Sequence, residues 1–331
     1  MAVNVLFTSV GRRVELLRAF RRAYQRLGLE GNIVAADMDP LSPGLRVADR
    51  PYVVPRLDST DFVPALAQIL HRERVDIVFP LIDPDIPALA QNREILEATG
   101  ARLAVVPEEA ALLAADKWLT NRFFQRLGLP TPRSWLPGEH ELPEVEYPVF
   151  IKPRFGSASQ QTFKVENPRQ LAFFSEYVSQ PIVQEYLHGP EITNDVACDL
   201  DGTVLSVVSR ERIRVRAGEV LVGKTIFDQE IAKACVRIAE ALPAVGPITV
   251  QCMRNGRTLA FTEINARFGG GVPLSIAAGA DSPLWLLARA AGIAVSIPPL
   301  GSYQQGLYFS RFDDSFFFSE AERDPMASHR L

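Results

Sequence analysis

The first third of the chain alternates short apolar runs with longer segments whose apolar residues recur at helical spacing. In the first of these segments the apolar positions are Val14, Leu17, Phe20 and Tyr24, three or four residues apart as one face of a helix requires. The pattern predicts strands at 3–7, 32–36, 76–80 and 102–106 and helices at 14–24, 61–73 and 84–98. Strands and helices in alternation are typical of a parallel sheet covered on both faces. We therefore expect an α/β domain over residues 1–107.

Several polar side chains follow the predicted strands, where parallel sheets bind ligands. They are Ser9, Gly11, Arg12, Asp37, Asp39, Asp83 and Asp85. Two interpretations stay open for the acids: they line a ligand site, or Asp37, Asp83 and Asp85 cap helices and turns. A dinucleotide site is not expected, because G-x-G-x-x-G is absent after the first strand.

From Pro107 onward the pattern changes to helices followed by strands in antiparallel order. Helices are predicted at 108–115 and 119–127, and Gly128 and Pro130 end the second one. A proline-rich connector then leads to strands at 147–153, 161–165, 182–187, 192–200, 203–215 and 219–226 and helices at 168–178 and 228–242. The second half of the chain is therefore predicted to be α+β.

One later stretch, residues 249–271, carries an unusual polar face. It reads as two strands joined around an Asn-Gly pair, followed by a glycine cluster that opens a helix. Glu263, Asn265 and Arg267 occupy alternate positions of the second strand, so their side chains point to one face. Oxygen ligands beside a guanidinium suit Mg²⁺ shared with phosphate. The alternative is an exposed polar face of a sheet.

Gln251 lies twelve residues before Glu263 and is a candidate for the same face. A strict two-residue turn at Asn255-Gly256 would put the two side chains on opposite faces, whereas a three- or five-residue loop with a bulge would put them on one face. Shared metal binding therefore predicts an odd-length loop.

Two further segments carry weaker signals of nucleotide binding. Lys152 precedes the Gly- and Ser-rich loop 154–160, where backbone N–H groups can approach phosphate oxygens beside the lysine cation; a hairpin turn is the alternative. Strand 183–187 ends shortly before Glu191. Its backbone edge can pair with a purine and the carboxylate can accept ribose hydroxyls; a core strand with a solvated Glu is the alternative.

Composition narrows the class of protein without naming one. The 331 residues are 47% hydrophobic and 22% charged, typical of a globular protein with two or three domains. The net charge of −4 and the scattered Lys and Arg argue against a nucleic-acid partner. We expect Cys198, Cys235 and Cys252 to be buried thiols in a reducing compartment. No apolar run reaches the ~20 residues of a membrane span, so we expect a cytoplasmic protein without membrane contact.

Taken in order, these segments resemble the ATP-grasp superfamily, in particular one half of the carbamoyl-phosphate synthase large chain. The most specific piece is Gln251 with the run Glu263-Ile264-Asn265-Ala266-Arg267, which is similar to the family's metal and arginine signature. The resemblance implies ATP and Mg²⁺ as cofactors, with Mn²⁺ as an alternative metal. Gln251 stands where many members have Glu, and Ala266 stands where the synthase has proline, so the departure at Gln251 concerns metal affinity.

The resemblance also implies a role for individual residues. The roles are metal ligation by Gln251, Glu263 and Asn265, phosphate contacts by Arg267, Lys117 and Lys152, adenine binding by Gln184, Glu185, Tyr186 and Leu187, ribose binding by Glu191, and a lid at 154–160 that includes Gly156, Ser157 and Ser159. Lys224 is expected to join Lys152 and Arg267 in catalysis by binding the acid substrate. Candidates for the same task are Arg210, Arg212, Arg214 and Arg216, although a solvated strand face is the favoured explanation for these arginines.

The implied organisation is an α/β N-terminal parallel-sheet domain followed by an α+β ATP-grasp fold whose two subdomains clasp ATP. The predicted parts are a pre-ATP-grasp Rossmann-like domain at 1–107, a small or lid subdomain at 108–187, a large subdomain with the metal site at 188–300 and a C-terminal tail at 301–331. In the tail we expect Asp313 to Phe318 to pack on the sheet or on a partner chain, and the last residues to be disordered.

The implied activity is that of a carboxylate–amine ligase that forms an acyl phosphate and releases ADP and phosphate. Its partners are then a small-molecule acid and amine, and a homodimer is left open. Full carbamoyl-phosphate synthesis is not expected, because that enzyme needs two grasp units. The competing hypotheses are a ligase that uses a thiol or another nucleophile, and a catalytically silent ATP-binding regulatory or partner subunit.

Overall fold

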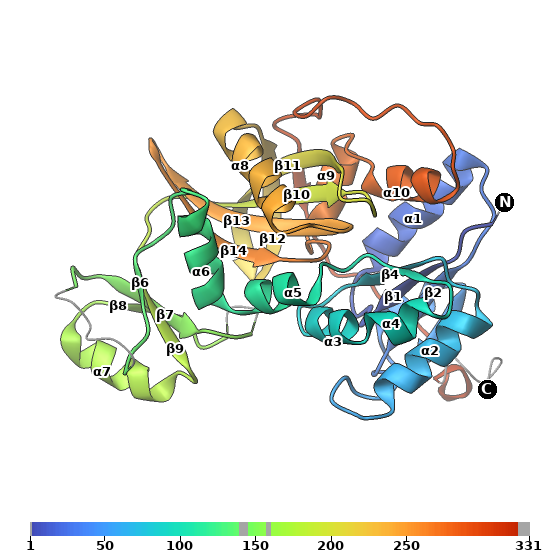
Figure 1. Ribbon diagram of the computed structural model, residues 1–331, viewed down its shortest axis with the longest axis horizontal. Helices are drawn as coiled ribbons and strands as arrows, with labels where there is room; N and C mark the ends of the chain where they lie inside the picture. The colour runs from blue at the N-terminus through green and yellow to red at the C-terminus, as the bar shows by residue number, and fades with distance from the viewer. Residues whose placement is uncertain (1, 139–144, 157–159, 324–331) are drawn as a thin grey trace.

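The computed structural model describes residues 2–138, 145–156 and 160–323. Three β-sheets with their helices make up this part of the chain. Figure 1 shows a parallel sheet at one end of the molecule, a six-stranded sheet in the middle and a four-stranded sheet at the other end. The combination of a parallel-sheet domain with an α+β region confirms the predicted fold class.

The N-terminal domain is a five-stranded parallel sheet in the order β3-β2-β1-β4-β5. Its elements are β1 (Val5–Thr8), α1 (Val14–Leu27), β2 (Ile33–Asp37), β3 (Arg50–Val53), α2 (Phe62–Arg72), β4 (Ile77–Pro80), α3 (Asp85–Gln91), α4 (Arg93–Glu97) and β5 (Arg102–Leu103). The predicted helix 84–98 is divided at Asn92, whose backbone is not helical. Strand β3 was missed because Arg50 and Pro51 interrupt the apolar pattern, and proline is tolerated there because β3 is an edge strand.

The central sheet is antiparallel, in the order β14-β13-β10-β11-β12-β15. Its strands are β10 (Glu191–Cys198), β11 (Val204–Arg216), β12 (Glu219–Ile226), β13 (Pro247–Asn255), β14 (Thr258–Asn265) and β15 (Tyr308–Ser310), with helices α8 (Gln229–Ala241), α9 (Val272–Ala277) and α10 (Ser282–Ala290). Alternation along β13 is strict: Ile248, Val250 and Cys252 join the core that includes Ile238 of α8, while Gln251 lies on the other face. That polar face is the one that lines the site described below.

The third sheet has four strands in the order β6-β9-β7-β8 and its own small core. Its elements are β6 (Ser134–Trp135), β7 (Val149–Pro153), β8 (Phe163–Val165), α7 (Pro168–Tyr177) and β9 (Pro181–Glu185). The preceding helices α5 (Glu108–Ala115) and α6 (Lys117–Arg126) pack instead on the central sheet, where the Phe124 and Phe261 ring centroids are 5.7 Å apart. The helices that the sequence groups with the small subdomain thus contact the larger one.

The N-terminal domain and the central sheet meet through buried aromatic rings. Phe268, three residues after β14, lies 6.0 Å from Phe20 and 5.6 Å from Phe79, measured between ring centroids. Phe268 itself is 2% exposed. Phe268, which closely follows the polar hairpin, therefore also anchors the two domains to each other.

The tail packs on its own chain. Strand β15 pairs with β12, Asp313 forms ion pairs with Arg216 (2.9 Å) and Arg12 (3.4 Å), and the Arg46 guanidinium lies 3.9 Å above the Phe318 ring. The last predicted stretch, from residue 324, lies outside the described residues.

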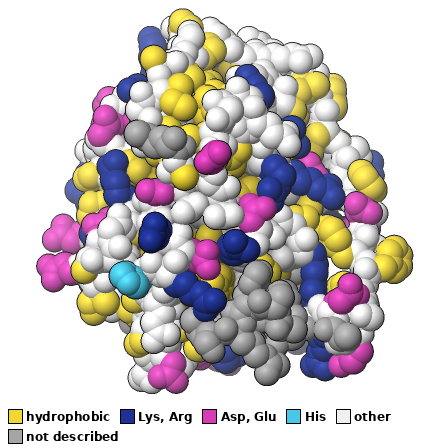
Figure 2. Space-filling view, turned by 90° about the vertical axis from the view of Figure 1, so that its right-hand side faces the viewer, with side chains coloured by type: hydrophobic (Ala, Val, Ile, Leu, Met, Phe, Trp, Pro, Cys, Tyr) yellow, Lys and Arg dark blue, Asp and Glu magenta, His cyan; other side chains and the backbone are white. Residues whose placement is uncertain are grey.

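Surface charge and helix character are two further features of the fold. On the face shown in Figure 2, positive and negative side chains are interspersed, without a block of one sign. Among the helices of the described ranges, none combines the length and apolar character of a membrane span.

The aromatic anchor can be tested with Phe268→Ala. We expect this substitution to lower the free energy of unfolding by about 3–5 kcal/mol, because it leaves a cavity between two domains. Phe317→Ala is the matched control, since Phe317 is 95% exposed and its loss should change stability by less than about 0.5 kcal/mol. Urea unfolding followed by circular dichroism measures both, and equal effects would show that Phe268 is not an anchor.

Candidate active site

The register of the β13–β14 hairpin corrects one prediction. The strands are joined by a two-residue loop, because Asn255 pairs with Thr258, so the expected odd-length loop was wrong. A β-bulge at Thr262 shifts the register instead, and Gln251 pairs directly with Glu263. One extra residue reverses which face the following side chains occupy. Gln251 and Glu263 therefore share a face, as shared metal binding requires.

All three sheets contribute to one pocket of about 750 Å³. The predicted site residues that line it are Lys117, Lys152, Gly156, Gln184, Glu185, Tyr186, Leu187, Glu191, Gln251, Glu263, Asn265 and Arg267. Ser157 and Ser159 lie outside the described residues. Residues up to 150 positions apart in sequence thus meet in one cavity, which the sequence alone did not establish.

Lys224 lies apart from these residues. It is not among those that line the pocket, and its ammonium lies 3.5 Å from the Glu211 carboxylate. Glu211 alternates along β11 with Arg210 and Arg212, which do line the pocket, so Glu211 and Lys224 project from the opposite face of the sheet. The structure gives no support to a catalytic role for Lys224.

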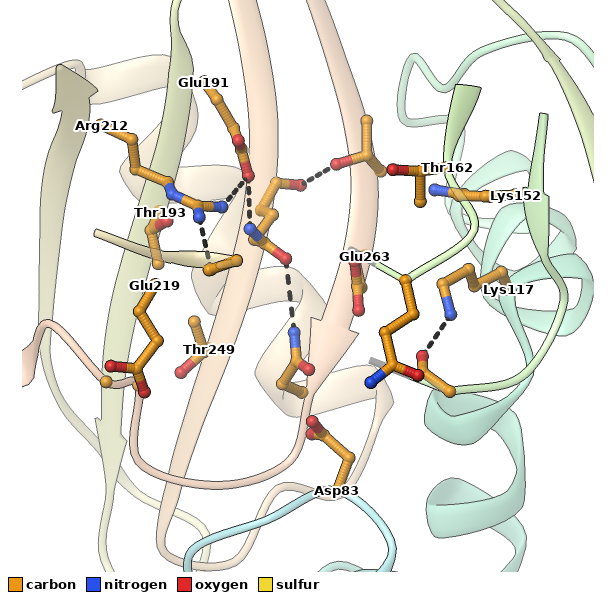
Figure 3. Close-up of a pocket in the computed structure, with 18 of the residues that line it drawn as sticks. Asp83, Lys117, Lys152, Thr162, Glu191, Thr193, Arg212, Glu219, Thr249 and Glu263 are labelled. Atoms are coloured by element: carbon orange, nitrogen blue, oxygen red, sulfur yellow. Dashed lines mark hydrogen bonds and ion pairs between the residues drawn. The ribbon is translucent and has the colours of Figure 1, made fainter. Parts of the chain in front are cut away.

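Two of the three predicted metal ligands, Gln251 and Asn265, belong to a hydrogen-bonded wall, whose bonds are drawn as dashed lines in Figure 3. Gln251 Nε2 donates to Glu191 Oε1 at 2.5 Å, and Asn265 Nδ2 lies 3.5 Å from Gln251 Oε1. Arg267 Nη2 donates to Asn265 Oδ1 at 3.2 Å. Glu263 is half-buried, and within the described ranges no hydrogen bond or ion pair engages its carboxylate.

This wall fits a hard divalent cation. Its donors are one unpaired carboxylate, from Glu263, and the amide oxygens of Gln251 and Asn265, which are the kinds of oxygen ligand that Mg²⁺ takes together with substrate phosphates. No group of three His, Cys, Asp or Glu able to hold a metal occurs in the part of the chain that the structure describes. A metal here would therefore depend on a ligand that brings its own oxygens.

Two lysines face the wall from the small sheet and from α6. Lys117 is 9% exposed and its Nζ donates to the Gly156 carbonyl at 2.6 Å. Lys152 is 7% exposed, and its pKa falls to about 8, mainly through burial and further through Lys117, although Glu263 and Glu191 oppose the shift. A polyanion in the pocket would offset the cost of burying this charge.

The predicted adenine segment lies along the same pocket. Gln184 is buried and its Nε2 donates to Ser134 Oγ at 2.8 Å, while Glu185 pairs with Arg133 at 3.4 Å. Past the end of β9, the backbone N–H groups of Tyr186 and Leu187 have no hydrogen-bond partner among the described residues. Unpaired backbone donors beside a cavity are suited to a ligand with its own acceptors.

The arginines of β11 form the solvated face that the sequence favoured only in part. Arg210 is 1% exposed and binds the Asp195 carboxylate through Nε (2.6 Å) and Nη2 (2.9 Å). Arg212 donates to Glu191 at 2.5 Å. Of the four arginines, Arg214 and Arg216 are exposed.

The acids at the edge of the N-terminal sheet divide between the two open interpretations. Asp37 accepts from the Gly11 backbone N–H at 2.7 Å, and Asp85 accepts from Thr8 Oγ1 at 2.6 Å and has its pKa raised to about 6 by burial; both hold turns. Asp83 instead accepts from Arg267 Nη2 at 2.5 Å. It thus connects the N-terminal domain to the pocket.

Sequence reasoning missed Arg13 and Glu219, both of which line the pocket. Arg13 follows the first strand directly, at the sheet edge where ligands bind, and that position was an available signal. Glu219 offered none, because it stands at the start of a strand among unremarkable neighbours.

Fold and site together define a class. Two antiparallel sheets enclose a pocket with two buried lysines, an arginine and a set of oxygen donors, next to a parallel-sheet domain. This is the arrangement of a protein that clasps a polyphosphate ligand together with a divalent cation.

Comparison with known proteins names the family. Residues 114–271 match the ATP-grasp domain, and residues 5–104 match the PylC-like N-terminal domain. The chain thus contains an ATP-grasp domain, as its motifs indicated. ATP and Mg²⁺ are the cofactors of this family, and the donor set described above fits them.

The chain is similar in sequence to several known proteins over part of its length. It is 27% identical to carbamoyl-phosphate synthase of Methanobrevibacter smithii over 176 residues, which are 51% of this chain and 46% of that one. It is 30% identical to D-alanine–D-alanine ligase of Pseudomonas entomophila over 149 residues, 42% of this chain and 46% of that one. The chain therefore spans less than half the length of these relatives.

Solved structures share the fold over most of the chain. Biotin carboxylase of Campylobacter jejuni has a TM-score of 0.71 at 20% identity and covers 93% of this chain and 74% of its own. N5-carboxyaminoimidazole synthetase of Staphylococcus aureus, complexed with ADP, has a TM-score of 0.71 at 16% identity, with 91% and 80% covered. These likenesses confirm the fold.

The buried charge of Lys152 leads to a stability prediction. Its folded-state pKa lies below the unfolded value, so the destabilisation is fully present below pH 8 and is relieved as the pH rises from about 8 to 10.5. We expect Lys152→Met to raise the free energy of unfolding at pH 7 by about 1–2 kcal/mol, and this gain to shrink above pH 8.

Lys164→Met is the control, because Lys164 is exposed and its partners among the described residues are Glu166 and the Tyr186 ring. Urea unfolding of both variants between pH 7 and 10 measures the difference. A gain for Lys152→Met that is constant across this range would mean that side-chain hydrophobicity, rather than buried charge, causes it.

Proposed function

We propose that this protein is an ATP-dependent carboxylate–amine ligase that acts through an acyl phosphate and releases ADP and phosphate. The observation that carries the proposal is the convergence of Lys117, Lys152, Glu263, Asn265 and Arg267 on one cavity. These residue types match the requirements of phosphoryl transfer, which are positioning and neutralisation of charge rather than covalent chemistry.

In this proposal each group of pocket residues has a separate role. Lys117 and Lys152 bind phosphate oxygens from the small-sheet side, and the backbone of Tyr186 and Leu187 binds the base. Arg267 steadies the transferred group, and its contact with Asp83 fixes the guanidinium in place. Bound Mg²⁺-ATP supplies the phosphoryl group and the divalent charge. Burial of the pocket strengthens each of these charge interactions.

Two charged side chains without partners in the described ranges favour a catalytic protein over a silent ATP-binding subunit. Glu263 and Lys152 are kept without an ion pair or hydrogen bond between described residues. Such groups cost the folded protein stability, and they are typical of working sites. A protein that only held the nucleotide would have less reason to keep both.

The activity is tested by measuring ADP release with a panel of carboxylic acids combined with a panel of amines and thiols. We expect turnover with an acid and an amine, and a fall in kcat/KM of about 100-fold or more in Glu263→Gln, which loses one group acting on the transition state. Glu211→Gln is the matched control on the opposite face of the sheet and should retain activity.

Other outcomes would redirect the proposal. Tight binding of Mg²⁺-ATP without turnover by any pair would favour the silent subunit, and turnover with thiols alone would favour the other nucleophile. Loss of activity in Glu211→Gln would support a catalytic role for Lys224, the ion-pair partner of Glu211.

The metal wall is tested with Gln251→Glu. Gln251 donates a hydrogen bond to Glu191, whereas a carboxylate at position 251 would repel Glu191 unless a cation lay between them. In EDTA we expect the midpoint of thermal unfolding to fall by about 2–4 °C, and Mg²⁺ to restore it more than it raises the wild-type midpoint.

Gln125→Glu, at an exposed position of α6, controls for the added charge. If Mg²⁺ shifts the Gln251→Glu and wild-type midpoints equally, the metal does not lie beside residue 251.

A further inference from the structure

Arg13 brings a cation from the N-terminal domain into the pocket. It lies between β1 and α1, lines the pocket together with Gly269 to Gly271, and its side chain is 18% exposed. The glycines leave the space that the guanidinium occupies, because a Cβ at Gly270 would overlap Arg13 Nη1. Arginine and glycine positions from two domains are thus matched to each other.

The other arginines around the pocket already have acidic partners. Arg210 pairs with Asp195, Arg212 with Glu191, Arg267 with Asp83, and Arg311 with Glu219 at 3.1 Å. Glu219 also lies 3.8 Å from Arg13, too far for a hydrogen bond. Of these five arginines, Arg13 alone has no carboxylate of the described residues within hydrogen-bonding distance.

Arg13 is the arginine left over in this count. Its side chain donates no hydrogen bond to any residue of the described ranges, although a guanidinium has five N–H donors. Burial, together with the charges of Arg267 and Arg311, lowers the pKa of Arg13 to about 10, against the opposing effect of Glu219 and Asp83. An anion beside Arg13 would supply the missing partner.

An unpaired acceptor lies in the same part of the pocket. Asp83 Oδ2 binds Arg267, but Asp83 Oδ1 is buried and has no hydrogen-bond partner among the described residues. The charges of Asp83 and Arg13 act on each other. Figure 3 shows Glu219, which contacts Arg13, and Lys152 on opposite sides of Glu263. Arg13 is therefore on the side of the pocket away from the lysines that we assign to ATP, and Asp83 lies between the two sides, below Glu263 in this view.

We propose that Arg13 and Asp83 form the binding site for an amino acid, which is the amine substrate of the ligase. Arg13 binds the carboxylate, whose two oxygens match the fork of the guanidinium, and Asp83 Oδ1 accepts from the amino group. This carboxylate is not consumed by the reaction. The inference rests on the proposed function, because a carboxylate–amine ligase requires an amine substrate and the inference specifies the chemical class of that amine.

Binding is measured by equilibrium dialysis of each of the twenty common L-amino acids against wild-type protein with Mg²⁺-ADP present. We expect one or a few to bind, their amides (in which the carboxylate is neutralised) to bind at least about tenfold more weakly, and N-acetyl derivatives to fail. Arg13→Ala should weaken binding by about tenfold to a hundredfold and Arg13→Lys by less, because lysine keeps the charge without the fork.

Arg12→Ala is the matched control, since Arg12 is 70% exposed and pairs with Asp313 on the surface. It should leave amino-acid affinity unchanged. The affinity of each Arg13 and Arg12 variant for Mg²⁺-ADP should equal that of the wild type, which shows that the fold and the nucleotide site are intact. A loss of both affinities in Arg13→Ala and Arg13→Lys would mean that Arg13 is structural, and would overturn the proposal.

Dialysis of Glu263→Gln separates this inference from the proposed function. We expect that variant to bind the amino acid while losing ADP release. Amino-acid binding without ligation in the wild type would refute the ligase and leave the site in place. The site itself is refuted if no amino acid binds, if amides bind as tightly as acids, or if only phosphorylated amines bind.

Discussion

The bulge at Thr262 is the constraint on which the pocket depends. A strand alternates its side chains between two faces, so without the extra residue Glu263 and Asn265 would point into the apolar core beneath α5, α6 and α8. A carboxylate there would be costly. Beyond β14 the same segment reaches the N-terminal domain, where Phe268 packs between aromatic rings. One hairpin therefore sets both the chemistry of the wall and the position of the domain that completes it.

The second feature of the pocket is a pair of buried cations, Lys152 and Arg13, that have no anionic partner of their own in the part of the chain that the structure describes. Lys152 and Arg13 come from different domains, and burial lowers the pKa of each. Neighbouring lysine or arginine charges add to the shift, while the acids nearby oppose it only in part. A protein selected for stability alone would neutralise or expose these cations. Their persistence indicates anionic ligands at two places, beside Lys152 and beside Arg13, and these are the places that we assign to phosphate and to a carboxylate.

Elements that depend on residues close together in the sequence were predicted, whereas those that depend on distant residues were not. The α/β rhythm of the N-terminal domain is local, so β1, α1, β2, α2 and β4 were predicted within a few residues. Short strands such as β6 and β15 were missed, because they exist through pairing with distant partners, Gln184 and Lys224 among them. The burial of Arg210 was missed for the same reason: its partner Asp195 lies on the neighbouring strand, and no period along β11 distinguishes Arg210 from exposed Arg216.

The sequence by itself determined the resemblance to ATP-grasp proteins and the alternation of Glu263, Asn265 and Arg267, because a motif and a period of two are properties of neighbouring residues. Tertiary structure decided how Gln251 reaches their face, since a bulge rather than the turn supplies the shift of register. It also decided which cations lack partners. Whether Arg13 or Lys152 is paired depends on carboxylates and solvent exclusion contributed by three sheets, and no segment of the chain contains that information alone.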